Sequence, residues 1–257
     1  MEIIDFHTHP YIDDKTNICR HKEYVKISPV ETVDYLKGMG ISKICGSVIT
    51  AGEKELKGFD KIKADNEKML QLKELYGDFY IPGFHIHPHY IKESMEEIEK
   101  MHKLGINLIG ELVPYIDGWA NYSVDGLSEI LDLAEQYSMV VNFHSLDDKS
   151  MDKMVSEHKN VVFIAAHPGE YDNFMGHLKR MRMSENYYLD LSGTGLFRHG
   201  MLRRGIDECG VERFIFGSDY PVCNPAMFIG GVMNDSLISD SEKEAIFAKN
   251  IKRILHI

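Results

Sequence analysis

The chain has 257 residues, 44% hydrophobic and 27% charged, which suits one large folded domain. Its 40 acidic and 29 basic residues give a net charge of −11, which argues against a broad nucleic-acid-binding surface. No apolar run reaches the ~18 residues of a membrane span, and no secretory signal pattern opens the sequence. The four cysteines form no CxxC pair. We therefore expect a cytoplasmic protein without a disulfide framework.

Eight short runs rich in apolar and β-branched residues predict eight strands, with helical patterns between them. A proline after Ser28 and a glutamate at 31 predict that a helix begins there, and Ser241 with Glu244 predicts the start of a final helix. The strands are expected at about 2–7, 43–49, 79–85, 106–111, 139–144, 161–167, 187–192 and 213–219.

Eight strands that alternate with helices predict a (β/α)8 TIM barrel, formed by residues 1–257 as a single domain. A doubly wound sheet is the alternative, but the glycine-rich dinucleotide loop after the first strand is absent. Loops that follow strands hold the active site of a barrel. We expect specificity to lie in four of them, at 10–28, 86–94, 112–124 and 220–235.

Histidine is the unusual residue, with 13 copies, and His7-Thr8-His9 closes the first strand. Residues two apart on a strand point to the same side, so both imidazoles face one way. Four further apolar runs each stop at a polar residue: Glu111, His144, His167 and Asp219. Packing alone does not explain why five strands deliver such groups to one rim, which indicates a metal site. Nitrogen and carboxylate ligands suit Zn²⁺, and also Fe²⁺, Mn²⁺ or Co²⁺.

The order of these residues resembles the amidohydrolase superfamily of metal-dependent barrels, and several segments resemble its amidohydrolase-related branch. That branch holds hydrolases and non-oxidative decarboxylases. The segments are Ile4-Asp5-Phe6-His7-Thr8-His9, Ala166-His167-Pro168-Gly169, Tyr188-Leu189-Asp190-Leu191-Ser192-Gly193, Gly217-Ser218-Asp219-Tyr220-Pro221 and Asn250-Ile251-Lys252-Arg253-Ile254-Leu255.

Glu111 departs from the single-metal members and resembles the strand-4 glutamate of TatD-like deoxyribonucleases in the same superfamily. The single-metal form implies four ligands, with His167 beside them as a proton donor or acceptor. These ligands are His7, His9, His144 and Asp219. The two-metal form implies His7, His9 and Asp219 on one ion, His144 and His167 on the other, and Glu111 as the bridge. We favour the two-metal form.

These parts predict an enzyme that cleaves an amide, ester or lactone bond in a small molecule. A bound divalent ion lowers the pKa of water from about 15.7 toward about 7 and polarises a carbonyl. Asp219 is expected to accept the proton of the water and return it to the leaving group, with His167 as its catalytic partner. A non-oxidative decarboxylase and a TatD-like nuclease are the alternative functions. The sequence leaves open whether the chain forms a homo-oligomer.

Other polar residues are secondary candidates. His85, His87 and His89 share a face after the third strand and are candidates for substrate contacts, and Asp5 is a candidate for orienting a ligand histidine. Loop residues are weaker candidates, because surface packing explains them better than a substrate contact does; they are Tyr115, Trp119, Arg198 and Tyr220. A basic group is expected to be a solvated helix face: Lys179, Arg180, Arg182, Arg203 and Arg204.

Overall fold

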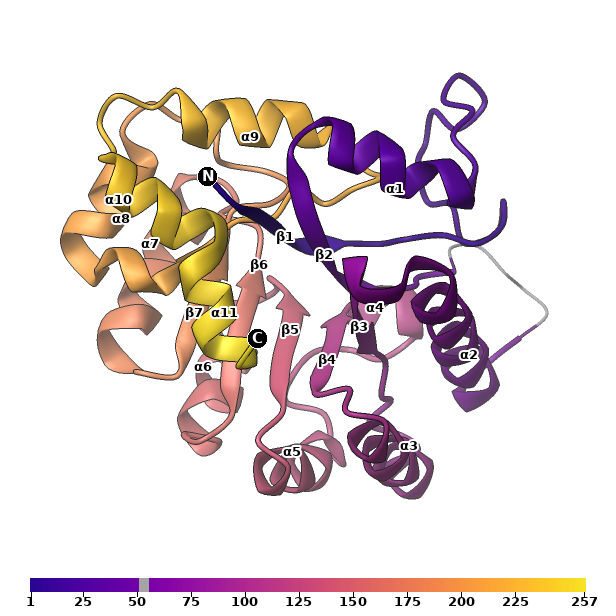
Figure 1. The fold of residues 1–257 in the computed structure, drawn as a ribbon. Coiled ribbons are helices and arrows are strands. Elements are labelled where there is room, and N and C mark those ends of the chain that lie inside the picture. The colour runs from indigo at the N-terminus through magenta and orange to yellow at the C-terminus, as the bar shows by residue number, and fades with distance from the viewer. Residues whose placement is uncertain (51–55) are drawn as a thin grey trace.

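The computed structural model describes residues 1–50 and 56–257. Its eight parallel strands pair in the order β1 to β8 and curl into a barrel (Figure 1). The strands are β1 (Ile3–Thr8), β2 (Ile41–Ser47), β3 (Tyr80–Phe84), β4 (Leu108–Leu112), β5 (Val140–His144), β6 (Val162–Ala166), β7 (Tyr187–Asp190) and β8 (Phe214–Ile215).

The barrel closes between its first and last strands. The amide of Phe6 donates to the carbonyl of Phe216, and a parallel bridge joins Thr8 to Tyr220. The predicted TIM barrel is therefore confirmed, and the doubly wound alternative is wrong because its sheet stays open. The eight predicted strands are all present, although β8 has regular pairing only at Phe214–Ile215, well short of the expected end at 219.

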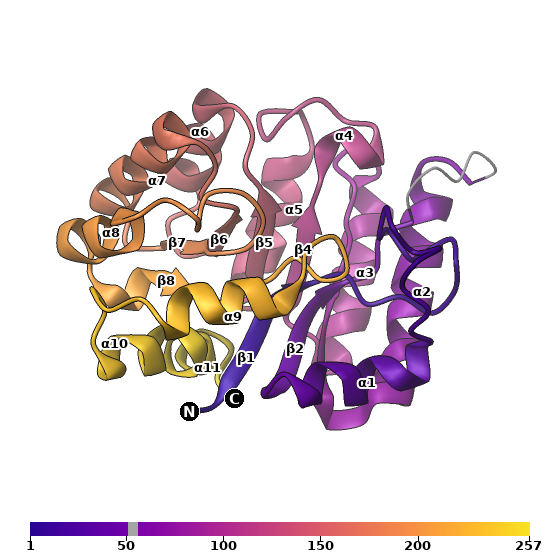
Figure 2. The ribbon, with the colours of Figure 1, turned by 90° about the horizontal axis from the view of Figure 1, so that it is seen from above.

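Helices follow the strands and cover the outside of the barrel (Figure 2). They are α1 (Pro29–Gly38), α2 (Phe59–Tyr76), α3 (Ile91–Lys103), α4 (Pro114–Asp117), α5 (Leu127–Gln136), α6 (Asp148–Glu157), α7 (Tyr171–Met183), α8 (Met201–Cys209), α9 (Pro225–Met233), α10 (Asp240–Glu244) and α11 (Asn250–Leu255). Short 3-10 turns lie at Gly77–Phe79 and Val211–Arg213, and a π-helical turn at Ala245–Lys249 joins α10 to α11.

Capping explains where two of these helices begin. The predicted capping box at Ser28 is confirmed, since Ser28 and Glu31 satisfy each other's backbone N–H. The box predicted at Ser241 is wrong by two residues, because Ser239 caps the helix with Glu242. Both serines have a glutamate three residues later, so sequence alone does not separate them.

A layer of apolar side chains fills the barrel near the amino ends of the strands. It takes one or more residues from every strand, among them Ile4, Val140 and Ile215. Ile251 and Ile254 of α11 pack against the same layer. The C-terminal helix therefore closes this end, and the polar residues gather at the other, carboxyl end. No helix in the described part of the chain combines the length and apolar character needed to cross a membrane.

Candidate metal centre

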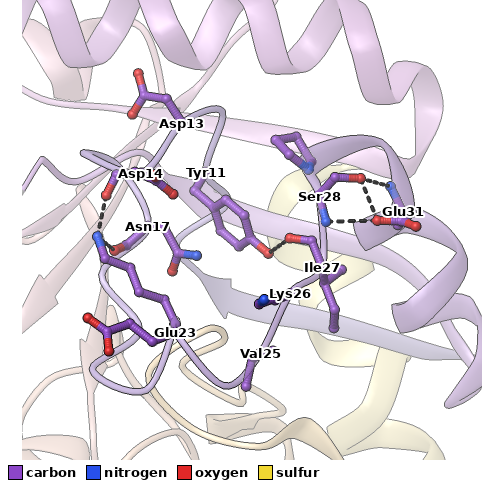
Figure 3. A pocket seen from close by; sticks show the side chains of 12 residues that line it. Tyr11, Asp13, Asp14, Asn17, Glu23, Val25, Lys26, Ile27, Ser28 and Glu31 are labelled. Atoms are coloured by element: carbon purple, nitrogen blue, oxygen red, sulfur yellow. Dashed lines mark hydrogen bonds between the residues drawn. The ribbon is translucent and has the colours of Figure 1, made fainter.

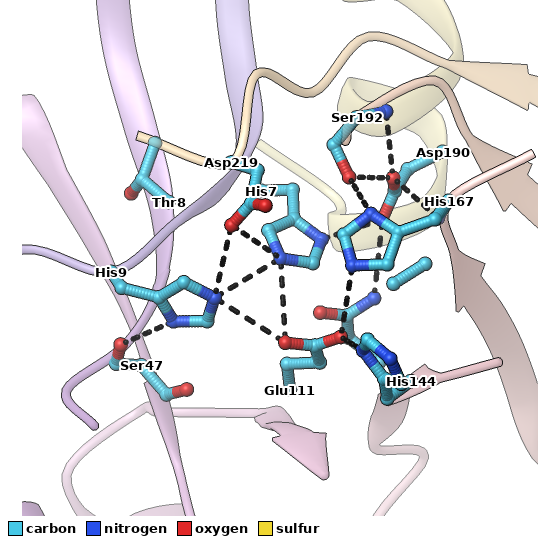
Figure 4. A network of polar contacts seen from close by, with 12 residues as sticks. His7, Thr8, His9, Ser47, Glu111, His144, His167, Asp190, Ser192 and Asp219 are labelled. Carbon is cyan, nitrogen blue, oxygen red and sulfur yellow. Dashed lines mark hydrogen bonds and ion pairs between the residues drawn. The ribbon is translucent and has the colours of Figure 1, made fainter. Parts of the chain in front are cut away.

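His7 of β1 and His9, the first residue after this strand, turn their Nε2 atoms toward one point, 3.1 Å apart (Figure 4). The other ring nitrogen of each histidine, Nδ1, lies within hydrogen-bond distance of a protein oxygen. Nδ1 of His7 lies 2.8 Å from Oδ2 of Asp190, and Nδ1 of His9 lies 3.1 Å from the carbonyl of Ser47. When both Nδ1 atoms donate to these oxygens, both Nε2 atoms carry free lone pairs, which is the arrangement of metal-ligating imidazoles.

Carboxylates complete this group. Oε2 of Glu111 lies 3.5 Å from Nε2 of His7 and 3.3 Å from Nε2 of His9. Oδ1 of Asp219 lies 3.8 and 3.6 Å from the same two atoms. Four ligands in a tetrahedron with bonds of about 2.1 Å lie about 3.4 Å from one another. The spacing of the ligand atoms of His7, His9 and Glu111 therefore fits one divalent cation, with Asp219 beside the two histidines. We call His7, His9 and Asp219 the buried half of the centre.

The second oxygen of Glu111 faces two other histidines, His144 and His167, which we call the open half. Oε1 of Glu111 lies 2.8 Å from Nδ1 of His144 and 3.7 Å from Nε2 of His167. The potential ligand atoms of these three residues all lie within 4.8 Å of one another. Glu111 therefore stands between two groups of ligand atoms, with one oxygen directed to each.

Exposure separates the two halves. The side chains of His7 and His9 are 1% and 3% exposed, whereas those of His144 and His167 are 23% and 15% exposed. Tyr115 of α4 stands at the same opening, with its ring centroid 5.4 Å from that of His144. The centre therefore opens to solvent on the side of His144 and His167.

Burial and neighbouring charges shape the pKa values of this centre. Burial lowers the pKa of His7, but Asp190 and Glu111 outweigh it and raise the pKa well above its usual value. Burial raises the pKa of Glu111, but His7 and the hydrogen bonds of His144 hold it well below its usual range. Burial also raises the pKa of Asp219 and lowers that of His167. The cluster thus keeps an ionised carboxylate inside the barrel, which a cation would stabilise.

The backbone is bent where the strands deliver these groups. His167 and Asp219 have φ values of 69° and 65°, a left-handed conformation that is rare for residues with a Cβ. Gly193 leaves room for His167, since a Cβ at this position would lie 2.3 Å from the Nδ1 of that ring. Strand pairing is also irregular beside His7 and Glu111, with register shifts between Asp5 and Thr8 and between Ile109 and Leu112.

The structure brings together all six predicted site residues and adds others that the sequence reasoning missed. Asp190 holds His7, and Ser192 lies 3.0 Å from Nδ1 of His167. Asp190 ends an apolar strand, as His144 does, so the same pattern could have identified it. Ser47 acts through its backbone carbonyl, which no side-chain pattern reveals.

Asp5 does not orient a ligand imidazole in the structure. Its carboxylate accepts hydrogen bonds from the backbone N–H and the hydroxyl of Ser218, at 2.9 and 2.5 Å. Asp5 therefore fixes the turn that precedes Asp219. The role predicted for Asp5, orienting a ligand histidine, belongs to Asp190, which contacts His7.

The histidines after β3 lie apart from the centre. Nε2 of His85 lies 2.8 Å from the carbonyl of Val48, and Nε2 of His87 lies 3.1 Å from the carbonyl of Asp117. Neither ring belongs to the two groups of candidate ligands in the described residues. Both rings therefore serve the packing of neighbouring loops, and His89 is exposed.

The weaker loop candidates have different surroundings. Trp119 and Tyr220 are buried, whereas Tyr115 is 63% exposed. The guanidinium of Arg198 donates to the carbonyl of Gly169 and pairs with Glu170. It is thus already engaged, which weakens its predicted role as a clamp for a substrate anion.

The first loop, expected to shape specificity, encloses a cavity of about 570 Å³ (Figure 3). Tyr11 lines this cavity, and its hydroxyl donates to the carbonyl of Ile27 at 2.7 Å. The same hydroxyl lies 3.4 Å from that of Tyr220, the residue after Asp219. The loop therefore meets the turn of Asp219 through a tyrosine pair, while the cavity wall contains none of the six site residues.

A family model described as amidohydrolase matches residues 4–257. The chain belongs to the amidohydrolase family. This family is metal-dependent, and the chain is an enzyme of the amidohydrolase superfamily. No curated protein sequence matches it.

The chain also resembles solved structures, at identities that establish the fold alone. A 2,6-dihydroxybenzoate decarboxylase from Rhizobium has a TM-score of 0.79 and 13% identity, over 99% of this chain and 98% of the other. A dihydroxybenzoic acid decarboxylase from Polaromonas, with bound manganese, has a TM-score of 0.76 and 13% identity, over 99% and 97%. A probable 2-pyrone-4,6-dicarboxylic acid hydrolase from Acinetobacter baumannii has a TM-score of 0.69 and 14% identity, over 100% of both chains.

Proposed function

We propose that this member of the amidohydrolase family is a two-metal hydrolase that cleaves an amide, ester or lactone bond in a small molecule. The observation that carries the proposal is the position of Glu111, with Oε2 directed to His7 and His9 and Oε1 directed to His144 and His167. A carboxylate shared in this way is typical of two-metal hydrolytic centres.

The ligand sets follow the two halves. His7, His9 and Asp219 would hold one ion, His144 and His167 would hold the other, and Glu111 would join them. Nitrogen and oxygen donors without thiolate suit Zn²⁺ or Mn²⁺. Divalent ions held there would supply nucleophilic water at neutral pH and polarise the scissile carbonyl.

The protein side chains supply the remaining steps. Asp219 accepts the proton of the attacking water and returns it to the leaving group. Its Oδ1 faces His7 and His9, whereas its Oδ2 faces the thiol of Cys223, 3.9 Å away. His167 borders the opening, and because its Nδ1 contacts the hydroxyl of Ser192, its Nε2 would be free to hold the second ion.

A decarboxylase is the second candidate, and the similarity to two decarboxylase structures favours it. Such a substrate carries a carboxylate, which calls for a cation at the opening. Arg198, the candidate for that contact, is bonded to Gly169 and paired with Glu170. This pairing supports the hydrolase over the decarboxylase.

The basic residues of α7 and α8 give a nuclease no support. Arg180 pairs with Asp148 and Asp152, and Arg182 pairs with Glu208. These acids neutralise the positive charge that would attract a phosphate backbone.

Two measurements on one preparation test the proposal. Metal analysis of the zinc- or manganese-loaded chain should give two equivalents. The same sample should hydrolyse members of a panel of p-nitrophenyl esters, lactones and anilides and release no CO₂ from dihydroxybenzoates. One metal equivalent with CO₂ release would instead identify a decarboxylase.

A further inference from the structure

An apolar groove of about 510 Å³ lies between the loop after β7 and helix α9. Its lining consists only of glycine, alanine and large apolar residues, including Leu196, Phe197, Met227 and Phe228. Figure 2 shows α9 and the segment after β7 on the same side of the barrel. Because no lining side chain is charged or forms hydrogen bonds, the groove suits a hydrocarbon surface and not an ion or a sugar.

The two walls of the groove come from strands that also carry the metal centre. The loop wall follows Asp190 of β7, and α9 follows Asp219, which lies beyond the end of β8. Gly193 lines the groove and lies directly against the imidazole of His167. The groove therefore reaches the imidazole of His167 from the side of its Nδ1 atom.

The rims of the groove are large apolar side chains that face solvent. Phe197 is 74% exposed and Met227 is 73% exposed, one on each wall. The α9 sequence, Pro225–Met233, contains no charged residue, although only Pro225 and Val232 are buried. Exposed apolar side chains on both walls of the groove favour contact with an apolar group.

We propose that this groove binds an aliphatic chain or aromatic ring of the substrate, so that the enzyme acts on small molecules with an apolar substituent. The inference rests on the proposed function, because it places the scissile group of the same substrate at the metal centre. A volume of about 510 Å³ accommodates such a group, since ligand pockets measure about 300–1,000 Å³.

A series of alkyl hydroxamates tests the groove, because the hydroxamate group chelates a metal ion while the chain length varies. We would measure the Kd of acetohydroxamate, butyrohydroxamate, hexanohydroxamate and octanohydroxamate on the zinc-loaded chain by calorimetry. Each methylene that enters the groove should tighten binding by up to about fourfold. A flat series would overturn the proposal.

Gly230→Leu is the variant that fills the groove. A Cβ at Gly230 would have only Asn234 Nδ2 within 4 Å, at 3.8 Å, and leucine favours the helix more than glycine does. The variant should bind acetohydroxamate normally and lose the gain with chain length. Gly38→Leu is the matched control, because Gly38 ends α1 and a Cβ there would have no neighbour within 4 Å.

A neutral fluorescent probe separates failure of the groove from failure of the metal centre. N-phenyl-1-naphthylamine needs no metal ion, and Gly230→Leu should weaken its binding at least tenfold while Gly38→Leu does not. Absence of acetohydroxamate binding to the zinc-loaded chain would contradict the proposed function alone. Equal probe binding by both variants would contradict the groove.

Light scattering completes the test. If the native chain is a dimer that Gly230→Leu dissociates, and the hydroxamate series is unchanged by the variant, the groove holds a second copy of the chain and the proposal is wrong. A native chain and a variant with the same mass, together with a lost chain-length effect, support the substrate.

Discussion

The buried and open halves of the centre share Glu111 but are built differently. His7 and His9 are almost fully enclosed, and the back of each ring is bonded to Asp190 or to the Ser47 carbonyl. His144 and His167 are partly exposed, and Tyr115 stands beside them. Rigid, enclosed ligands retain a metal ion, whereas accessible ones admit substrate. We therefore infer that the buried half retains its metal ion and that the open half gives access to the substrate.

The largest expected effect comes from the buried half. His9→Ala should remove the metal from this half and lower kcat/KM by at least about 10⁴-fold, because the metal-activated water is lost. Metal analysis and a kinetic assay on the same sample measure both quantities. His102→Ala, on the exposed surface of α3, is the matched control and should change neither.

Retention of full metal content by His9→Ala would contradict the assignment. His144→Ala sharpens the comparison, since it should keep the ion of the buried half and lose the other.

Asp219→Asn separates metal binding from proton transfer. Asparagine preserves the shape and an oxygen ligand but accepts no proton, so kcat should fall about 10²–10⁴-fold while most of the metal is retained. The pH profile of kcat should lose the limb that reports this carboxylate. An unchanged kcat would refute the proposed role in proton transfer.

Asp190→Asn tests the hydrogen bond between Nδ1 of His7 and the carboxylate of Asp190. Loss of the carboxylate that orients a ligand imidazole should weaken zinc affinity about 10–100-fold. Competition with a chromophoric chelator measures this affinity. Asp5→Asn is the comparison, because Asp5 contacts Ser218 and not the ligand rings, and should have the smaller effect. Equal effects would show that Asp190 has no special role.

The smallest effect concerns His177, which packs under the open half. Its ring contacts the hydroxyls of Tyr187 and Ser145, at 2.6 and 3.3 Å. Burial, with help from Arg180, lowers the pKa of His177 to about 3. The unfolded chain therefore binds the additional proton between about pH 6.5 and pH 3, and the contribution of neutral His177 to folding stability is lost as the pH falls through this range.

His177→Gln should therefore reduce the slope of unfolding free energy against pH by up to about 1.4 kcal/mol per pH unit between pH 6.5 and 4. Urea unfolding at several pH values measures this slope, and His102→Gln should leave it unchanged. Parallel curves for the native chain and His177→Gln would contradict a neutral buried His177.

The sequence predicted the candidate ligands near the strand ends better than it predicted the backbone conformations and hydrogen bonds that hold them in place. An apolar run that stops at His144 marks the carboxyl end of β5, and the barrel then gathers such ends at one rim. The left-handed backbone of His167 and the carbonyl of Ser47 depend on tertiary contacts, which leave no pattern in nearby residues. The groove beside α9 has the same origin, since it exists only where two distant loops meet.

An anomalous-diffraction structure of crystals grown with zinc tests the central claim, that Glu111 joins two ions. Our account predicts two zinc peaks about 3.5–4 Å apart, one beside His7, His9 and Asp219 and the other beside His144 and His167, with one Glu111 oxygen on each. A single peak that Glu111 does not contact would contradict it.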